Sequence, residues 1–131
     1  MFFIEKITNK EVNNVIKTHK VEHREFFTNE KIIYALKDKD KRVVGMVGVS
    51  RNKQLIGSVK LYNPFVLDNN LKYGKMLIKS VVKNIIKNDD IVFCDVKTEA
   101  KPYFESAGFK FTSVKENLKL YDKLWRGIYY R

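Results

Sequence analysis

The chain has 131 residues, of which 44% are hydrophobic and 13% aromatic, and this composition excludes a disordered or low-complexity protein. Its 26 lysine and arginine residues, against 15 acidic ones, give a net charge of +11, which favours anionic partners such as nucleic acid or phosphate-bearing ligands. The first residues do not resemble a signal peptide, no apolar run approaches about 18 residues, and the single cysteine, Cys94, excludes an intrachain disulfide. We therefore expect one cytoplasmic domain, residues 1–131, that is a monomer or homodimer without a membrane partner.

The N-terminal half predicts a strand, a helix and an antiparallel meander. Residues 1–7 alternate weakly between apolar and polar side chains, as a first strand would. Thr8 and Glu11 have the spacing of a capping box, which predicts a helix start, and apolar residues then recur at helical spacing to about Phe27. The meander follows, with strands expected at residues 31–37, 42–50 and 54–67.

The third strand of this meander contains Asn63-Pro64, and proline cannot donate a hydrogen bond to a neighbouring strand. Two interpretations stay open at this point. Either the strand ends at Tyr62, or it bulges and separates from its neighbour near Asn63, which would leave a gap between two strands.

The C-terminal half predicts two helices that alternate with strands. A polar loop at residues 68–74 leads into a helix expected at residues 75–87, and its lysines at positions 75, 79, 83 and 87 lie along one edge. Gly108 is expected to end a second, short helix, because glycine adopts the left-handed conformation after a helix C-terminus without strain. Strands are expected at residues 91–96, 109–114 and 118–124.

The segment Ala100-Lys-Pro-Tyr-Phe-Glu-Ser-Ala-Gly-Phe109 resembles the last core segment of the GCN5-related N-acetyltransferases, the GNAT superfamily. The predicted order β-α-β-β-β-α-β-α-β-β is similar to the order in that superfamily. The resemblance implies an α/β (α+β) fold with a mixed, mainly antiparallel central sheet flanked by helices. It also implies that the central strands splay near Asn63 and that the pantetheine arm of coenzyme A lies in the gap.

The loop before the 75–87 helix carries a second resemblance. The family pattern is Arg/Gln-x-x-Gly-x-Gly/Ala, and the segment from Asn69 to Gly74 is similar to it at Gly74 but has Asn69 and Lys72 at the other fixed positions. Backbone N–H groups at a helix N-terminus bind pyrophosphate, so the resemblance implies an acetyl-CoA site here. The residues predicted to form it are Val66, Leu67, Asn69, Asn70, Leu71, Lys72, Tyr73, Gly74, Lys75 and Met76.

The resemblance implies direct transfer of an acetyl group from acetyl-CoA to an amine, assisted by a base and by an acid. The usual acid is a tyrosine four residues before the closing glycine, where this chain has Phe104. The preceding Tyr103 inherits the role only if the helix start is shifted, because one residue turns a helical side chain by about 100°. We predict Tyr103 and Asp68 as catalytic residues, His23 and Asp95 as acceptor-binding residues, and no metal.

Two alternative functions suit the positive charge. The segments Val44-Gly-Met-Val-Gly48 and Phe65-Val-Leu-Asp-Asn-Asn70 loosely resemble those of phage Mom-type DNA-base-modifying members of the superfamily. The chain could also be a degenerate member that binds nucleic acid or a protein partner without catalysis, since Asn69, Lys72 and Phe104 replace residues of the family pattern. The lysine edge of the 75–87 helix would then contact phosphates.

Overall fold

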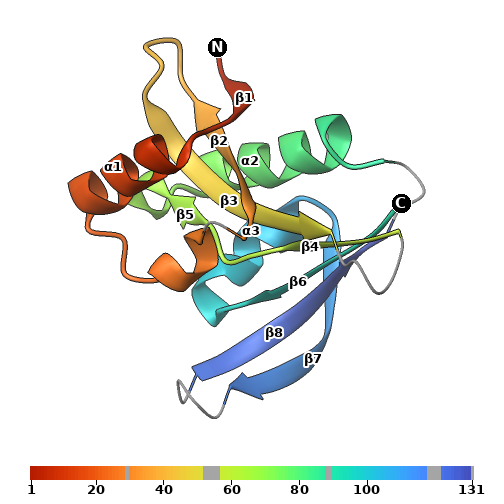
Figure 1. Ribbon diagram of the computed structural model, residues 1–131. Helices are drawn as coiled ribbons and strands as arrows, with labels where there is room; N and C mark the ends of the chain where they lie inside the picture. Colours follow the sequence, from red (N-terminus) through yellow and green to blue (C-terminus); the bar gives the residue numbers. More distant parts are fainter. Residues whose placement is uncertain (29, 52–56, 88–89, 118–121, 131) are drawn as a thin grey trace.

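The computed structural model describes residues 1–131 except 29, 52–56, 88–89, 118–121 and 131. Within the described residues an eight-stranded sheet has the strand order β1-β2-β3-β4-β6-β8-β7, and β5 pairs with β3 beside β4 (Figure 1). The strands are β1 (Phe3–Lys6), β2 (Ile32–Lys37), β3 (Val43–Arg51), β4 (Ser58–Leu61), β5 (Phe65–Val66), β6 (Ile91–Val96), β7 (Phe109–Asn117) and β8 (Asp122–Tyr129). The α-helices are α1 (Asn9–His19), α2 (Leu71–Asn84) and α3 (Lys101–Ser106), and short 3₁₀ turns are η1 (Arg24–Phe27), η2 (Leu67–Asn69) and η3 (Thr98–Ala100).

The sheet is mixed and mainly antiparallel, as predicted. Neighbouring strands in the described residues pair antiparallel except β4 and β6, which run parallel from Ser58 opposite Ile91 to Leu61 opposite Cys94. A parallel pair needs a crossover connection, and α2 supplies it between β4 and β6. The predicted element order is therefore confirmed.

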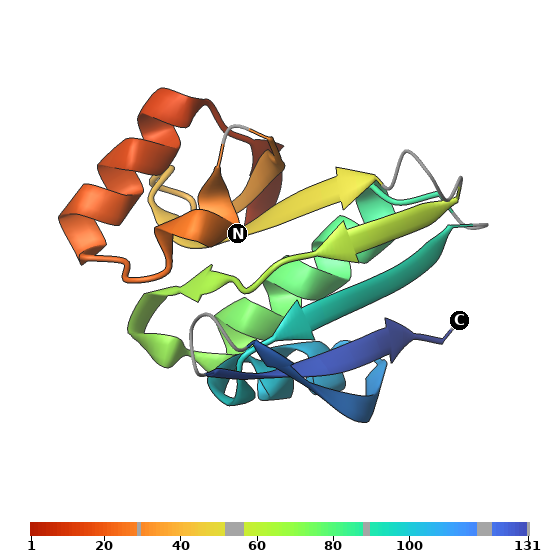
Figure 2. The same cartoon turned by 60° about the horizontal axis from the view of Figure 1, so that its bottom comes forward.

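Helices cover both faces of the sheet. Successive strand residues point to opposite faces, and in β2 Ala35 belongs to one hydrophobic cluster whereas Leu36 belongs to another. The first cluster packs α1 on the sheet through Val12, Val15 and Ile16. The second packs α2 and α3 on the other face, and α2 runs behind β4 and β6 in Figure 2. The chain thus forms a three-layer arrangement in which one end of the sheet stays accessible between the helices.

The boundaries of two helices differ from the prediction. The first helix ends at His19 and does not reach Phe27, because Lys20 adopts a left-handed conformation (φ 52°) and its N–H closes the last turn on the Ile16 carbonyl. Phe27 lies in the separate turn η1. The second helix begins at Leu71, four residues before the predicted start, because the Asn70 side chain caps it.

Two strand predictions fall partly on residues outside the described part. The strand expected at 54–67 begins with residues 54–56, of which nothing is described, and its remainder is divided into β4 and β5. The strand expected at 118–124 includes residues 118–121, and the described strand β8 extends well beyond its predicted end, to Tyr129.

The sheet opens where the chain passes Asn63-Pro64. Both β4 and β5 pair with β3, but Leu61 opposes Val49 and Phe65 opposes Met46, so four steps on one strand match three on the other. This extra residue is a bulge. On the other side, pairing with β6 ends at Leu61 although β6 continues to Val96. The strand β4 ends at Leu61, and the chain then bulges and separates from β6 before it pairs with β3 again as β5, so each of the two interpretations holds in part.

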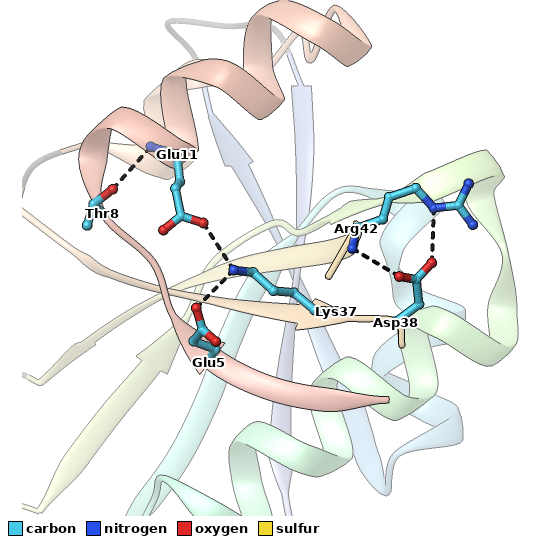
Figure 3. A network of polar contacts seen from close by, with 6 residues as sticks. All are labelled: Glu5, Thr8, Glu11, Lys37, Asp38 and Arg42. Atoms are coloured by element: carbon cyan, nitrogen blue, oxygen red, sulfur yellow. Dashed lines mark hydrogen bonds and ion pairs between the residues drawn. The ribbon is translucent and has the colours of Figure 1, made fainter. Parts of the chain in front are cut away.

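A buried lysine fastens β1 and α1 to the sheet (Figure 3). Lys37, at the end of β2, is 8% exposed, and its Nζ donates to Glu5 Oε1 at 2.9 Å and to Glu11 Oε2 at 3.1 Å. The expected N-cap is present, since the Glu11 N–H donates to Thr8 Oγ1 at 3.2 Å. The Glu11 side chain therefore binds Lys37 and does not complete the capping box. Lys37 connects the start of α1, through Glu11, and the strand β1, through Glu5, to the end of β2.

Replacing Lys37 with methionine should lower the free energy of unfolding by about 1–3 kcal/mol, the usual contribution of hydrogen bonds to charged groups. Burial by itself lowers the pKa of Lys37, but the bonds to Glu5 and Glu11 outweigh it, so the pKa is raised. This stabilisation is complete below the ordinary lysine pKa of 10.5 and is lost as pH rises through the raised value. Urea denaturation at neutral and alkaline pH measures both effects.

The matched control is Arg42→Met, which breaks an exposed ion pair with Asp38 at 3.0 Å in the same region of the sheet (Figure 3). Exposed pairs contribute less to stability, so this variant should remain closer to the unmodified chain. Equal stability of Lys37→Met and the unmodified chain at neutral pH would contradict the role of Lys37.

Candidate functional site

A cleft of about 670 Å³ lies at the opening between β5 and β6. Three segments form its wall: the turn after α1, the bulged segment that leads into η2, and the connection from β6 to α3. The lining residues are His19, Lys20, Val21, Glu22, His23, Asn63, Pro64, Phe65, Val66, Asp68, Asn69, Lys97, Glu99, Ala100 and Tyr103. The cleft therefore brings together His23, Asp68 and Tyr103, three of the predicted catalytic and acceptor-binding residues that lie far apart in the sequence.

A hydrogen bond between Asn63 and Lys97 joins the two sides of the opening. Asn63 is 9% exposed, and its Oδ1 accepts from the Lys97 N–H at 2.9 Å. Since β6 ends at Val96, Lys97 is the first residue beyond the strand. The bulged segment and the end of β6 are thus held at a fixed distance across the cleft by a side chain and a backbone amide.

In α3 the aromatic neighbours Tyr103 and Phe104 point in different directions. Phe104 is fully buried and packs edge-on against Phe109, with ring centroids 5.1 Å apart. Tyr103 is 8% exposed and lines the cleft. Burial raises the pKa of Tyr103, so its hydroxyl keeps its proton at neutral pH. In the described part of the chain, no hydrogen-bond acceptor is found for this hydroxyl. Both rings belong to the hydrophobic core cluster, but of the two residues Tyr103 lines the cleft and carries a hydroxyl.

Gly74 lets the Tyr103 ring approach α2. A Cβ atom built on Gly74 would lie 2.2 Å from Tyr103 Cδ1, far inside van der Waals contact. Gly74 is buried, and the ring occupies the space that a side chain would need. Gly74, the glycine of the predicted phosphate-binding pattern, thus also has a packing role, because it leaves room for the ring of Tyr103, the candidate acid.

The first turn of α2 carries backbone N–H groups that no carbonyl of the helix itself accepts. The Asn70 side chain accepts from the Tyr73 N–H at 3.2 Å, and the Gly74 N–H bonds the Asn70 carbonyl at 3.0 Å. The N–H groups of Leu71 and Lys72 have no acceptor within the helix, because the first turn lacks preceding carbonyls. Lys72, at the position of the family's first glycine, lies inside the helix, where a lysine is accommodated without strain.

The predicted acetyl-CoA residues divide into three groups. Val66 and Asn69 line the cleft, and Leu67 packs against the core. Asn70, Leu71, Lys72 and Lys75 are on the exposed side of the first turns of α2. Tyr73 and Met76 pack on the core, and the Tyr73 ring lies 5.6 Å from that of Phe2. The side chains of Tyr73 and Met76 therefore anchor the first turns of α2 to the core.

Asp68 and Asn69 lie between β5 and α2 in left-handed conformations, with φ of 56° and 51°. Aspartate and asparagine tolerate this region better than most residues do. The two residues turn the chain sharply from the bulged strand to the helix. As a result, the Asp68 carboxylate borders the cleft at the end nearest the helix N-terminus.

His23 and Lys97 form a pair that the sequence analysis did not recognise as a unit. Lys97 Nζ lies 3.0 Å from His23 Nε2, and His23 Nδ1 lies 3.8 Å from Glu25 Oε1. Sequence reasoning selected His23 alone. The available signal for Lys97 was its position, because it follows the buried strand 91–96 directly, at the end that borders the gap.

Asp95 is placed away from the cleft lining. It is 3% exposed, and its Oδ1 and Oδ2 accept from Arg126 Nε and Nη2 at 2.8 and 2.9 Å. Lys60 Nζ lies 3.5 Å from Oδ2. The bond to Asp95 raises the pKa of Arg126, as expected for a bidentate pair. These contacts join β4, β6 and β8 and give Asp95 a structural position.

Two observations concern other classes of site. The described residues hold no group of three histidine, cysteine, aspartate or glutamate side chains that could ligate a metal ion. Likewise, none of the helices in the described ranges is both long and apolar enough to cross a membrane.

The family model described as acetyltransferase (GNAT) domain matches residues 4–119, so the chain belongs to the GNAT acetyltransferase family. No curated protein matches the sequence. A probable acetyltransferase from Staphylococcus epidermidis ATCC 12228 has a similar structure, with a TM-score of 0.71, 16% identity and 98% of each chain covered.

Two further solved structures share the fold. Aminoglycoside acetyltransferase AAC(6')-Ib in complex with coenzyme A has a TM-score of 0.74 at 10% identity, covering 100% of this chain and 95% of its own. A spermidine N-acetyltransferase SpeG chimera from Vibrio cholerae and hSSAT has a TM-score of 0.72 at 12% identity, covering 98% and 94%. The predicted superfamily is confirmed, whereas these comparisons do not show the Mom-type resemblance.

The contact between Gly74 and Tyr103 predicts that Gly74→Ala changes the free energy of unfolding in opposite directions with and without the Tyr103 ring. Alanine in a helix is normally more stabilising than glycine by up to about 1 kcal/mol. Gly74→Ala should instead cost about 1–3 kcal/mol, because the new Cβ overlaps the Tyr103 ring. In a Tyr103→Ala background the same change should be neutral or stabilising. Chemical denaturation of the four proteins measures the coupling, and additive effects would contradict the contact.

Proposed function

We propose that the protein is an acyl-CoA-dependent N-acetyltransferase that transfers an acetyl group directly from acetyl-CoA to an amine bound in the cleft. The observation that carries this proposal is the convergence at one opening of the sheet of Tyr103, Asp68 and the N-terminus of α2. Membership of the acetyltransferase family supports it. Solved relatives in fold include an enzyme with bound coenzyme A and one named for spermidine, which is an amine.

The residues around the opening fit acetyl-CoA. The separation of β5 from β6 opens a gap in the sheet beyond the Leu61–Cys94 pair, and such a gap suits the extended pantetheine arm. The N–H groups of Leu71 and Lys72, together with the dipole of α2, suit a pyrophosphate. The exposed Lys72 and Lys75 add positive charge beside these donors. In this proposal the thioester lies in the cleft, which Tyr103 borders.

The proposed reaction uses groups on the cleft wall. The neutral amine nitrogen attacks the thioester carbonyl carbon, the C–N bond forms and the C–S bond breaks. Asp68 accepts the proton that the amine loses, directly or through water, and Tyr103 donates to the leaving sulfur. Its raised pKa supports this role, because a protonated hydroxyl is required. Carboxylates of Glu22, Asp68 and Glu99 attract the ammonium form of the acceptor.

Asp95 stays outside this mechanism. Both of its oxygens bind Arg126, and the pair is held in the sheet, so we propose a structural role for it in place of acceptor binding. His23 remains a candidate for contact with the acceptor, since it lines the cleft.

Removing one backbone donor should weaken acetyl-CoA binding by about tenfold, the effect of one hydrogen bond to a charged group. Leu71→Pro does this at the first helical position, where proline is tolerated, and the preceding Asn70 is already extended (φ −73°, ψ 113°). Calorimetry with acetyl-CoA measures the change. Leu71→Ala is the matched control, because it shortens the same half-exposed side chain and keeps the N–H.

The outcomes separate the candidate functions. Equal affinity of the Leu71→Pro and Leu71→Ala variants would contradict the backbone cradle. Saturable acetyl-CoA binding by the unmodified chain is required by the proposal. A nucleic-acid-binding module would instead bind duplex DNA in a salt-sensitive manner and would not bind acetyl-CoA.

Tyr103→Phe should lower kcat for acetyl transfer to added amines by about 10²-fold, with little effect on acetyl-CoA affinity. The substitution removes only the hydroxyl and keeps the ring that packs against Gly74. A thiol-release assay with a panel of small amines measures the rate. Tyr129→Phe is the control, because its ring packs with Phe109 away from the cleft lining. An unchanged kcat in Tyr103→Phe would exclude Tyr103 as the acid.

A further inference from the structure

An imidazole and an amine that line the cleft, those of His23 and Lys97, lie beside a carboxylate outside its lining, that of Glu25. Glu25 Oε1 lies 3.8 Å from His23 Nδ1, and His23 Nε2 lies 3.0 Å from Lys97 Nζ. An ammonium group has donors and no acceptor, so at this bond Lys97 donates and the Nε2 lone pair accepts. The proton of the neutral imidazole is then on Nδ1, which faces the carboxylate. His23 Nε2 is thus within hydrogen-bond reach of the Lys97 amine, as a base is of the nucleophile that it activates, whereas Glu25 adds a nearby negative charge without a hydrogen bond.

The pair leaves His23 poorly suited to act as a base for an added amine, although His23 lines the cleft in which that amine would bind. The only lone pair of the neutral ring points at Lys97, and the other ring nitrogen faces Glu25. A base must lie within hydrogen-bond reach of the proton that it removes, and the proton within reach is on Lys97. The geometry therefore suits His23 to act as the base that deprotonates the Lys97 amine.

The backbone holds Lys97 in place. It follows β6 directly, and its N–H is bonded to Asn63 across the opening. The side chain lines the same cleft as Tyr103 and Asp68, the two residues to which the proposed reaction gives chemical roles. The exposed lysines along α2, at positions 75, 79 and 83, lie on the outer surface of the helix.

We propose that Lys97 is itself an acyl acceptor: the protein acetylates the Lys97 side chain in its own cleft, with His23 as the base. This inference rests on the proposed function, because acetyl-CoA supplies the acetyl group. His23 Nε2 takes one ammonium proton, and the Lys97 nitrogen attacks the thioester carbonyl carbon. The C–N bond forms, the C–S bond breaks, and the sulfur leaves as the thiol with the proton of the Tyr103 hydroxyl. The second proton lost by the nitrogen as the amide forms returns to the Tyr103 oxygen, and His23 releases its proton to water. The products are an acetyl-lysine and free coenzyme A, with no oxidant or reductant involved.

Acetylation would change the charge and the size of the Lys97 side chain in the cleft. The amide nitrogen of acetyl-lysine is uncharged and has one N–H where the ammonium had three. The acetyl group occupies volume beside His23, in space that an acceptor amine would otherwise use. The modification would therefore set the charge and the size of the acceptor end of the cleft.

The test uses the full chain and acetyl-CoA with a deuterated acetyl group, so that new label differs from acetylation acquired during expression. Peptide mass spectrometry follows the label on Lys97 and, in the same sample, on the exposed Lys79 of α2. We expect Lys97 to be labelled at least about tenfold faster than Lys79, at a rate independent of protein concentration. His23→Gln should lower the rate of Lys97 acetylation by about tenfold or more, since general bases contribute at least that much. The rate of Lys79 acetylation should stay unchanged.

Each outcome decides the proposal. Lys97 labelling no faster than Lys79, or a rate unaffected by His23→Gln in a variant that circular dichroism shows to be folded, overturns it. Calorimetry distinguishes its failure from that of the proposed function. If acetyl-CoA does not bind, both are wrong. If acetyl-CoA binds and added amines are acetylated while Lys97 stays unlabelled, only the inference about Lys97 is wrong.

Discussion

The separation of β5 from β6 is the constraint on which the rest of the site depends. A sheet that paired throughout would leave no room between its central strands. Here pairing stops after Leu61 and Cys94, and the bulge at Asn63-Pro64 turns the chain away from β6 while keeping its contact with β3. Proline favours this because it cannot donate to a neighbouring strand. The opening that results is the cleft.

The two sides of the opening stay at a fixed distance because polar groups connect them. The Asn63 side chain accepts from the Lys97 backbone, and the Lys97 side chain reaches His23 on the turn after α1. One lysine thus links the bulged strand, the end of β6 and the α1 turn. A cleft supported in this way positions its reactive groups before any ligand binds, which is a large part of what an acyl-transfer site requires.

The position of the candidate acid depends on the contact between two helices. Tyr103 reaches the cleft because Gly74 has no side chain, and the neighbouring Phe104 enters the core against Phe109. The departure from the family pattern at Phe104 therefore moves the tyrosine by one residue along α3 without removing it from the cleft. The glycine that aligns with the phosphate-binding pattern helps to place the acid.

The sequence by itself determined the elements and their order, because hydrophobic periodicity, the Thr8 cap and Gly108 are local signals, and the family resemblance of residues 100–109 added the architecture of the sheet. The helix end at Lys20 was missed, since a left-handed lysine leaves no such signal. Only the tertiary structure decided that Asn63-Pro64 marks a gap and that Lys97 is bonded to His23. Hydrogen bonds between residues far apart in the chain follow from how strands diverge and helices pack, and no local pattern records that geometry.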